Sequence, residues 1–175
     1  MDIRLIPPSA AYAEQVMAYR DAMLANRSSF DGCAGLEDCA SYEEWADFEN
    51  RLKRCYGEGY VPSDVYLAVR AEDDRLVGII DCRHHLSPFL LQYGGNVGYS
   101  VHPAERGKGY AGEMLRLLLE ICRKRGVARL LITCDKDNEA SRRAIVKNGG
   151  VLENEVADDV GLGDSGVIQR YWIDL

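Results

Sequence analysis

Long apolar runs and an excess of basic residues are both missing from this chain. No apolar segment reaches the roughly 18 residues needed for a helix to cross a bilayer, which argues against a membrane protein. Acidic residues number 28 and basic residues 21, and the resulting net charge of -7 argues against binding to nucleic acid. An acidic surface suits a cationic partner such as an amine, although acidity that serves only solubility is the commoner case.

Paired cysteines and a signal peptide are also missing. The six cysteines show no C-x-x-C spacing, which favours reduced structural thiols over disulfides or metal ligands. Cys82, His84 and His85 lie close together, but no second cluster completes a four-ligand metal shell. The segment 1–7 has neither a basic region nor a long apolar run. We therefore predict a cytoplasmic protein without a metal site.

The apolar periodicity predicts a single α/β domain over residues 1–175, with 47% apolar residues to form its core. A helix capped by Ser9 and another opened by the capping box Ser41-x-x-Glu44 follow the first strand. Tyr42, Trp45, Phe48, Leu52 and Tyr56 share one side of the second helix. The later elements are strands at 65–69, 76–80 and 96–101, a helix from 109 to before 126, a strand at 129–134, a helix of about a dozen residues from 137, and strands at 150–156 and 167–173, with a loop at 86–95. This order predicts a mixed, partly parallel central sheet flanked by about four helices.

One segment carries a chemical signal. The run Arg106-Gly107-Lys108-Gly109-Tyr110-Ala111, here called the glycine loop, follows a short apolar strand and opens a long apolar helix. Glycine lets the backbone approach a bulky anion, and the unpaired amides at a helix start favour negative charge. Two basic side chains add positive charge there. The loop therefore predicts a site for a phosphate or diphosphate, as in an enzyme that uses a nucleotide cofactor.

A dinucleotide fold is one interpretation of this loop. Gly107 to Gly112 fits G-x-G-x-x-G, and Asp135 lies about 20 residues further on. However, residues 102–106 separate the strand from the first glycine, whereas a dinucleotide fold turns tightly there. Too few strand-helix-strand units follow, and the motif lies past the middle of the chain. We therefore regard the dinucleotide interpretation as the weaker one.

The spacing Arg106-x-x-Gly109-x-Ala111 supports another interpretation when its surroundings are included. Val97-Gly98-Tyr99-Ser100-Val101-His102-Pro103 precedes it, and Asn138-x-x-Ser141 and Lys147-Asn148-Gly149-Gly150 follow. In this order, over roughly residues 75–155, the chain resembles the GCN5-related N-acetyltransferase (GNAT) superfamily. The stretch from Tyr93 to Ala111 looks especially like a subgroup labelled only "predicted acetyltransferase".

The resemblance implies that acetyl-coenzyme A (acetyl-CoA) is the acyl donor and lies where the strands at 96–101 and 129–134 splay apart. By position, Tyr99, Ser100 and Val101 would bind the pantetheine arm through their main chain. The amides of Arg106, Gly107, Lys108, Gly109, Tyr110 and Ala111 would hold the diphosphate. Asn138 matches the position near the thioester, although a polar residue at a helix start is an equally ordinary explanation. Ser141 would face the same side one turn later.

The implied reaction is direct attack of an amine on the thioester, but this chain departs from the family pattern at the usual acid and base. Ile145 stands where many members carry a tyrosine, and Asn96 and Thr133 stand where many carry a glutamate. Tyr99, Asp135 and His84, or the adjacent His85, are tentative substitutes. Each of them is also explained by an ordinary structural role, and ordered water would serve equally well as the proton path.

The leading prediction is therefore an N-acetyltransferase that acts on a primary amine of a small molecule or a peptide. The alternative is a non-catalytic sensor or regulatory module that binds acyl-CoA, motivated by the missing tyrosine and glutamate. The sequence leaves the acceptor open, although acidic residues such as Glu44 and Asp47 suggest that a cationic acceptor approaches residues 20–60. A solvated helix face is the simpler reading of these charges. The resemblance also makes a homodimer a fair guess.

Overall fold

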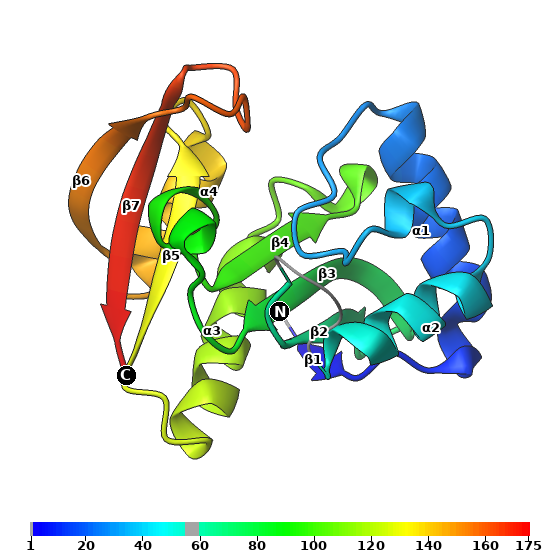
Figure 1. Ribbon diagram of the computed structural model, residues 1–175. Helices are drawn as coiled ribbons and strands as arrows, with labels where there is room; N and C mark the ends of the chain where they lie inside the picture. The colour runs from blue at the N-terminus through cyan, green and yellow to red at the C-terminus, as the bar shows by residue number, and fades with distance from the viewer. Residues whose placement is uncertain (1, 55–59) are drawn as a thin grey trace.

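The structure is a computed structural model that describes residues 2–54 and 60–175. Its strands form two sheets (Figure 1). The larger sheet has the order β1-β2-β3-β4, built from Ile3–Ile6, Ser63–Arg70, Arg75–Arg83 and Val97–Val101. The smaller sheet has the order β5-β7-β6, and these strands span Arg129–Asp135, Val167–Asp174 and Val151–Ala157. The two sheets lie side by side, with β4 and β5 facing each other.

The prediction of a partly parallel sheet is wrong for the described strands. Every strand pair within the two sheets is antiparallel. The strands β4 and β5 were expected to be neighbours in one sheet. Instead, a backbone hydrogen bond from the Asn96 amide to the Leu131 carbonyl, 2.7 Å long, joins the two sheets just before β4 begins. The sheet is divided at this point because the two strands separate beyond it.

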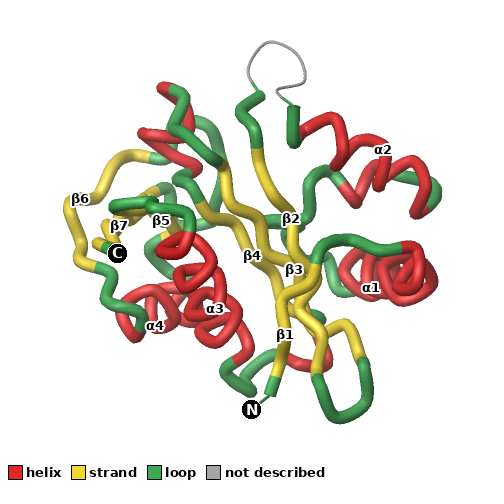
Figure 2. Tube along the Cα trace, turned by 90° about the horizontal axis from the view of Figure 1, so that it is seen from below, coloured by secondary structure: helices red, strands yellow, loops and turns green. Residues whose placement is uncertain are grey.

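Four α-helices cover the sheets, in the predicted order. They are α1 (Ala13–Ala25), α2 (Tyr42–Leu52), α3 (Tyr110–Lys124) and α4 (Glu139–Lys147). Figure 2 shows α1 and α2 on one side of the larger sheet and α3 on the other. The capping box is confirmed, since the Glu44 amide donates to the Ser41 hydroxyl over 3.2 Å. Tyr56, which was expected to continue the apolar side of α2, lies outside the described residues.

Two boundaries differ from the sequence-based expectations. The segment 86–95 is not wholly a loop, because Leu90–Gly94 forms a short π-helical turn. The helix expected from Asp137 begins only at Glu139 and has nine residues, because Asn138 is its N-cap. Both differences fall on the rim of the region where β4 and β5 separate.

The strand β2 contributes to two cores by alternation. Val65, Leu67 and Val69 pack in a cluster with residues of α1 and α2, whereas Tyr66 and Ala68 pack in a cluster with residues of α3. Successive side chains of a strand point to opposite faces, so one strand supplies both layers. The larger sheet is therefore buried on both sides.

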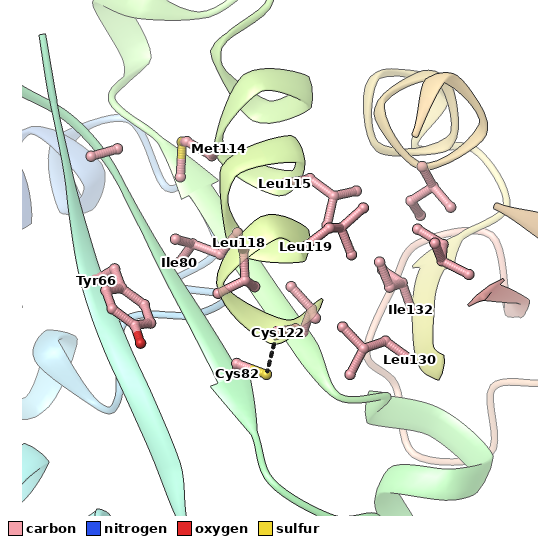
Figure 3. Packing of buried hydrophobic residues seen from close by; sticks show 14 of the residues in the cluster. Tyr66, Ile80, Cys82, Met114, Leu115, Leu118, Leu119, Cys122, Leu130 and Ile132 are labelled. Atoms are coloured by element: carbon pink, nitrogen blue, oxygen red, sulfur yellow. Dashed lines mark hydrogen bonds between the residues drawn. The ribbon is translucent and has the colours of Figure 1, made fainter. Parts of the chain in front are cut away.

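The helix α3 connects the two sheets. Its residues Met114, Leu115, Leu118, Leu119 and Cys122 are all buried and lie in one cluster with side chains from both sheets. Figure 3 shows this row between Ile80 and Cys82 of β3 and Leu130 and Ile132 of β5. The packing of α3 against both sheets fixes the angle at which β4 and β5 diverge. The described cysteines, Cys33, Cys39, Cys82, Cys122 and Cys134, are buried free thiols, and Cys55 lies outside the described residues.

Candidate functional site

The gap between β4 and β5 begins at Asn96. The Asn96 side-chain amide donates to the Arg83 carbonyl over 3.1 Å, and its oxygen accepts from the Leu131 amide over 2.9 Å. This side chain therefore closes the gap at one end and has no role as an acid or base. Gly95 is required beside it, because a Cβ there would lie 2.7 Å from the Leu131 carbonyl oxygen, and its φ is +64°.

Beyond Asn96, one edge of β4 is paired and the other faces open space. Tyr99, Ser100 and Val101 pair with Ile80, Ile79 and Gly78 of β3. The same three residues line a cavity of about 730 Å³, here called the first cavity. Successive residues of a strand turn their main-chain groups to opposite edges, and the bond from the His102 amide to the Val77 carbonyl places those of Ser100 toward β3. Tyr99 and Val101 therefore face the free edge. The Val101 carbonyl there already accepts from Arg106 Nε, and an extended ligand can provide partners for the other groups. This is the position that the sequence predicted for the splayed strand.

The glycine loop lies at the other end of the first cavity. Gly107 and Gly109 have φ values of +76° and +84°, in the left-handed region that favours glycine. The N-cap of α3 is Gly109, which has no side chain to accept from the amides of the first turn. Arg106, Gly107, Gly109, Tyr110 and Ala111 line the cavity. The Arg106 amide is already bonded to the Pro103 carbonyl over 3.4 Å. The later amides of the loop lie at the start of a 15-residue helix, where the helix dipole favours negative charge.

The two basic side chains of the glycine loop do not point freely into the cavity. Arg106 donates from Nη2 to the Ser28 hydroxyl over 2.7 Å and from Nε to the Val101 carbonyl over 3.2 Å. Lys108 donates to Glu105 over 2.8 Å, and it is not among the residues that line the first cavity. The main chain of the loop therefore carries the site, and these side chains hold it in place.

Glu105 is the buried centre of the charges beneath the glycine loop. Only 3% of its side chain is exposed, and Arg70 and Arg75 contact it at 3.0 and 3.5 Å in addition to Lys108. The hydrogen bond from the Lys108 ammonium holds the pKa of the Glu105 carboxyl below its ordinary value, although burial opposes this. The carboxylate thus stays ionised and fixes the start of α3.

Sequence reasoning missed the wall that α4 provides. Ala140, Arg143, Ala144 and Lys147 line the first cavity. This spacing of three and four residues places them on one face of a helix. The alanines leave room for a ligand, and the two basic residues supply positive charge that Arg106 and Lys108 were expected to supply. The spacing was visible in the sequence, but nothing there showed which way the face points.

A second cavity, of about 680 Å³, lies beside the first. Both cavities are lined by Ser29, Asp31, Tyr99 and Asn138, so they meet at these four residues. The other walls of the second cavity come from the end of β5, the turn before β4 and the loop between β6 and β7, and they include Thr133, Cys134, Asp135, Asp137, Phe89, Tyr93, Leu162 and Asp164. Asp31 and the loop at 162–164 were not expected from the sequence.

Tyr99 is the polar aromatic residue at the junction. Its hydroxyl lies 2.7 Å from the Ser141 hydroxyl, and the Asn138 oxygen accepts from the Ser141 amide over 3.0 Å. Asn138 is thus a helix cap and also lines both cavities. Burial raises the pKa of Tyr99 above its ordinary value. Its hydroxyl therefore keeps its proton at neutral pH and can donate it.

Asp135 lines the second cavity but is already engaged. Its Oδ2 accepts from the amide and the hydroxyl of Ser165 over 3.0 and 2.8 Å, and its Oδ1 accepts from the Asp137 amide over 2.8 Å. Burial alone would raise the pKa of Asp135, but these hydrogen bonds from Ser165 and Asp137 outweigh it and lower the pKa. A carboxylate held in this way is a weak base.

His84 is not brought to the junction, which corrects its tentative catalytic assignment. β3 ends at Arg83, and the His84 ring lies 2.9 Å from Asp64 of β2. Neither His84 nor His85 is among the described residues that line the two cavities. Ile145, at the position of the family tyrosine, is fully buried in the core. Thr133 donates its hydroxyl to the Tyr93 carbonyl over 2.7 Å and shapes a wall.

Within the ranges 2–54 and 60–175, no three His, Cys, Asp or Glu side chains converge as a metal site would require. No helix there has the length and apolar character needed to span a membrane.

A splayed strand edge, a glycine loop at a helix start and a second cavity at the junction define an acyl-CoA-dependent transferase. Comparison with protein families supports this class directly. The family described as "Acetyltransferase (GNAT) domain" matches residues 3–151. The chain belongs to this family of GNAT acetyltransferases. It is an N-acetyltransferase that uses acetyl-CoA as its acyl donor.

Solved structures with the same fold include enzymes with known acceptors. One is the ribosomal L7/L12 α-N-protein acetyltransferase RimL, in complex with coenzyme A that is bound through a disulfide to a cysteine. It is 20% identical to this chain, with a TM-score of 0.71, and the match covers 99% of this chain and 94% of that chain. An acetyltransferase from Salmonella typhimurium that modifies the N-terminal serine of L7/L12 is 20% identical, with a TM-score of 0.67 and coverage of 99% and 95%. The microcin C7 self-immunity acetyltransferase MccE, in complex with acetyl-CoA and AMP, is 17% identical, with a TM-score of 0.71 and coverage of 99% and 93%.

A comparison with curated protein sequences found no match.

Proposed function

We propose that this enzyme transfers the acetyl group from acetyl-CoA in the first cavity to a primary amine held in the second cavity. The observation that carries the proposal is that the two cavities meet at Tyr99 and Asn138. A thioester and an amine that enter from different sides can therefore reach each other directly. Direct attack needs this proximity and no covalent enzyme intermediate.

The donor is held mainly by main-chain groups. The free edge of β4, at Tyr99 and Val101, bonds the pantetheine arm, and the amides of residues 107–111 bond the diphosphate. Asn138 lies beside the thioester. Arg143 and Lys147 of α4 add positive charge near the phosphates. Because these contacts are mostly to the backbone, the side chains at these positions carry little of the donor specificity.

The acceptor is proposed to be the terminal amine of a peptide or protein. The second cavity is lined by four carboxylates, from Asp31, Asp135, Asp137 and Asp164, and by two basic side chains, Arg27 and Arg83. The excess of carboxylates favours an ammonium group. Phe89 and Tyr93 form an aromatic pair on the wall, with ring centroids 5.6 Å apart, that can cover an apolar side chain. Two of the structures with this fold act on the N-terminus of a ribosomal protein. A small amine would use the same carboxylates and fill less of the cavity.

The chemistry requires two proton transfers. An alkylammonium has a pKa near 10.4, so forming the neutral amine at pH 7 costs about 4 to 5 kcal/mol. A carboxylate or a desolvated pocket can offset this cost. The departing thiolate needs a proton. The Tyr99 hydroxyl, which stays protonated because burial raises its pKa, lies at the junction of the two cavities, where it can supply one.

A turnover assay tests the proposed function. The purified protein is incubated with acetyl-CoA and two versions of each peptide, one with a free N-terminus and one with a blocked N-terminus. A small primary amine is run in parallel. We expect free coenzyme A thiol and a mass gain of one acetyl group with the free peptide, and neither with the blocked one. Acetylation of the small amine alone would contradict the peptide acceptor, and no transfer to any amine would contradict the function itself.

The homodimer and the cytoplasmic location stay predictions. Analytical ultracentrifugation of the purified protein tests the first, and localisation of a tagged chain in cells tests the second.

A further inference from the structure

The loop between α1 and α2 is fixed against β4 beside the junction. A Cβ at Gly32 would lie 2.3 Å from the Gly98 carbonyl oxygen, so the two backbones are in direct contact. The next residue, Cys33, has its sulfur 3.1 Å from the Ser100 hydroxyl, and its carbonyl accepts from the Trp45 indole over 2.8 Å. Residues 32 and 33 are therefore held by β4 on one side and by Trp45 of α2 on the other.

Asp31 directly precedes this fixed segment and lines both cavities. Its Oδ2 accepts a hydrogen bond from the Ser29 hydroxyl over 2.8 Å. The side chain is otherwise exposed, so water can reach it. A short side chain on an anchored backbone has few positions available. The carboxylate is therefore held at the place where the two substrates of the proposed reaction meet.

The other carboxylates near the junction are less suited to accept a proton. Asp135 is bound by Ser165 and by the Asp137 amide, and Glu105 is bound by three basic side chains beneath the glycine loop. Asp137 and Asp164 line only the second cavity. Among the described acidic residues, Asp31 combines contact with both cavities, a single hydrogen bond and access to water.

We propose that Asp31 accepts the proton that the acceptor amine releases during attack on the thioester. This inference rests on the proposed function. The amine nitrogen forms a bond to the carbonyl carbon, the carbon–sulfur bond breaks, and its electron pair leaves on sulfur. Two of the three protons of the ammonium group must leave. One proton reaches the sulfur through the Tyr99 hydroxyl. The other proton passes to the Asp31 carboxylate and from there to solvent.

Three variants test this role. Asp31→Asn keeps the shape but cannot accept a proton, Asp31→Glu keeps the carboxylate, and Asp31→Ala leaves room for an added small carboxylate. Asp38→Asn is the matched control, since it removes the same charge from an exposed position in the same loop that lines neither cavity. Each protein is assayed with the acceptor that the wild type acetylates, and acetyl-CoA affinity and the melting temperature are measured alongside.

We expect Asp31→Asn to lower kcat about 10²-fold, the lower end of what acid–base groups contribute. Acetyl-CoA affinity and the melting temperature should stay at the wild-type values, which a merely structural role would not allow. Asp31→Glu should recover part of kcat, as should formate added to Asp31→Ala, and Asp38→Asn should match the wild type.

An unchanged kcat in Asp31→Asn, or a rise in acceptor KM alone, would overturn the proposal while the wild type stays active. A wild-type protein that binds acetyl-CoA but acetylates no amine would instead contradict the proposed function, and the inference with it.

Discussion

Tyr99 is the side chain on which the proposed chemistry at the junction depends most directly. It lines both cavities, and its hydroxyl lies 2.7 Å from that of Ser141. We expect Tyr99→Phe to lower kcat about 10²-fold and to leave the KM for acetyl-CoA nearly unchanged, because the proton donor is lost while the backbone contacts remain. Since burial raises the pKa of Tyr99, wild-type activity should not fall as pH rises toward 10.

Steady-state kinetics of both proteins check this prediction. Tyr66→Phe is the control, because it also removes a hydroxyl with a hydrogen-bond partner, Arg125 at 2.8 Å, but lies outside both cavities. A kcat for Tyr99→Phe within twofold of the wild type would assign the thiolate proton to water.

Glu105 carries a prediction about stability and pH. Its pKa is lowered in the folded protein, so its contribution is fully present above the ordinary value of 4.5 and is lost as pH falls through the folded value. Glu105→Gln removes the counter-charge of Lys108 and one of the two carboxylates that contact Arg70, the other being Asp73. We expect it to reduce the free energy of unfolding by about 1 to 3 kcal/mol at pH 7. The difference in free energy of unfolding between Glu105→Gln and the wild type should become smaller as the pH falls below 4.5.

Urea unfolding of both proteins between pH 3.5 and 7 measures this difference. Glu120→Gln, which disrupts an exposed pair with Arg116, should cost much less at every pH. A difference for Glu105→Gln that does not change with pH would show that shape, and not charge, explains its effect.

Among the elements, we expect the start of α3 to determine how tightly acetyl-CoA is held. Gly109→Glu places a side chain on a left-handed backbone with φ of +84° and a negative charge beside the expected phosphates. We expect the Kd for acetyl-CoA, measured by calorimetry, to rise at least about 10-fold. Gly126→Glu is the control, since its φ of +77° imposes a similar strain at the far end of the same helix. Equal affinity in the two variants would place the diphosphate elsewhere.

The order of the elements was predictable because most of them have a signal in their own local sequence. The capping box at Ser41, the apolar stripe of α3 and the alternation along β2 each follow from the physics of a single segment. The antiparallel character of the smaller sheet was not predictable, because it depends on the pairing of β5 with β7, and these strands are far apart in the chain. The turn at Leu90–Gly94 has no comparable local signal.

The site was predictable only where the main chain carries it. The spacing of Gly107 and Gly109 predicted an anion loop at the start of a helix, and the structure places both glycines at the start of α3. Anion binding by this loop stays a prediction. The role of Arg106 was not predictable, because its partner Ser28 comes from a distant loop. Asp31 gave no signal, since its position at the junction comes from the contact between Gly32 and Gly98.

Across the molecule, the two sheets are held apart at one side and together at the other. The helix α3 packs against both sheets, and the hydrogen bond between Asn96 and Leu131 joins them at one end of the gap. The first cavity lies in the remaining gap. The second cavity meets it at Tyr99 and Asn138. The sequence predicted splayed strands within one sheet, whereas the structure has two sheets. We propose that the gap between them gives room for a donor and an acceptor.

Hydrogen exchange of the backbone amides, with and without acetyl-CoA, shows most directly whether the donor lies between β4 and β5. We expect acetyl-CoA to slow exchange in residues 99–101 and 107–112, because the ligand then accepts from amides in these segments. Exchange in α1 and α2, on the far side of the larger sheet, should change little. Protection of these two segments would place the donor between β4 and β5. Unchanged exchange at both segments under saturating acetyl-CoA would contradict the placement of the donor in the first cavity.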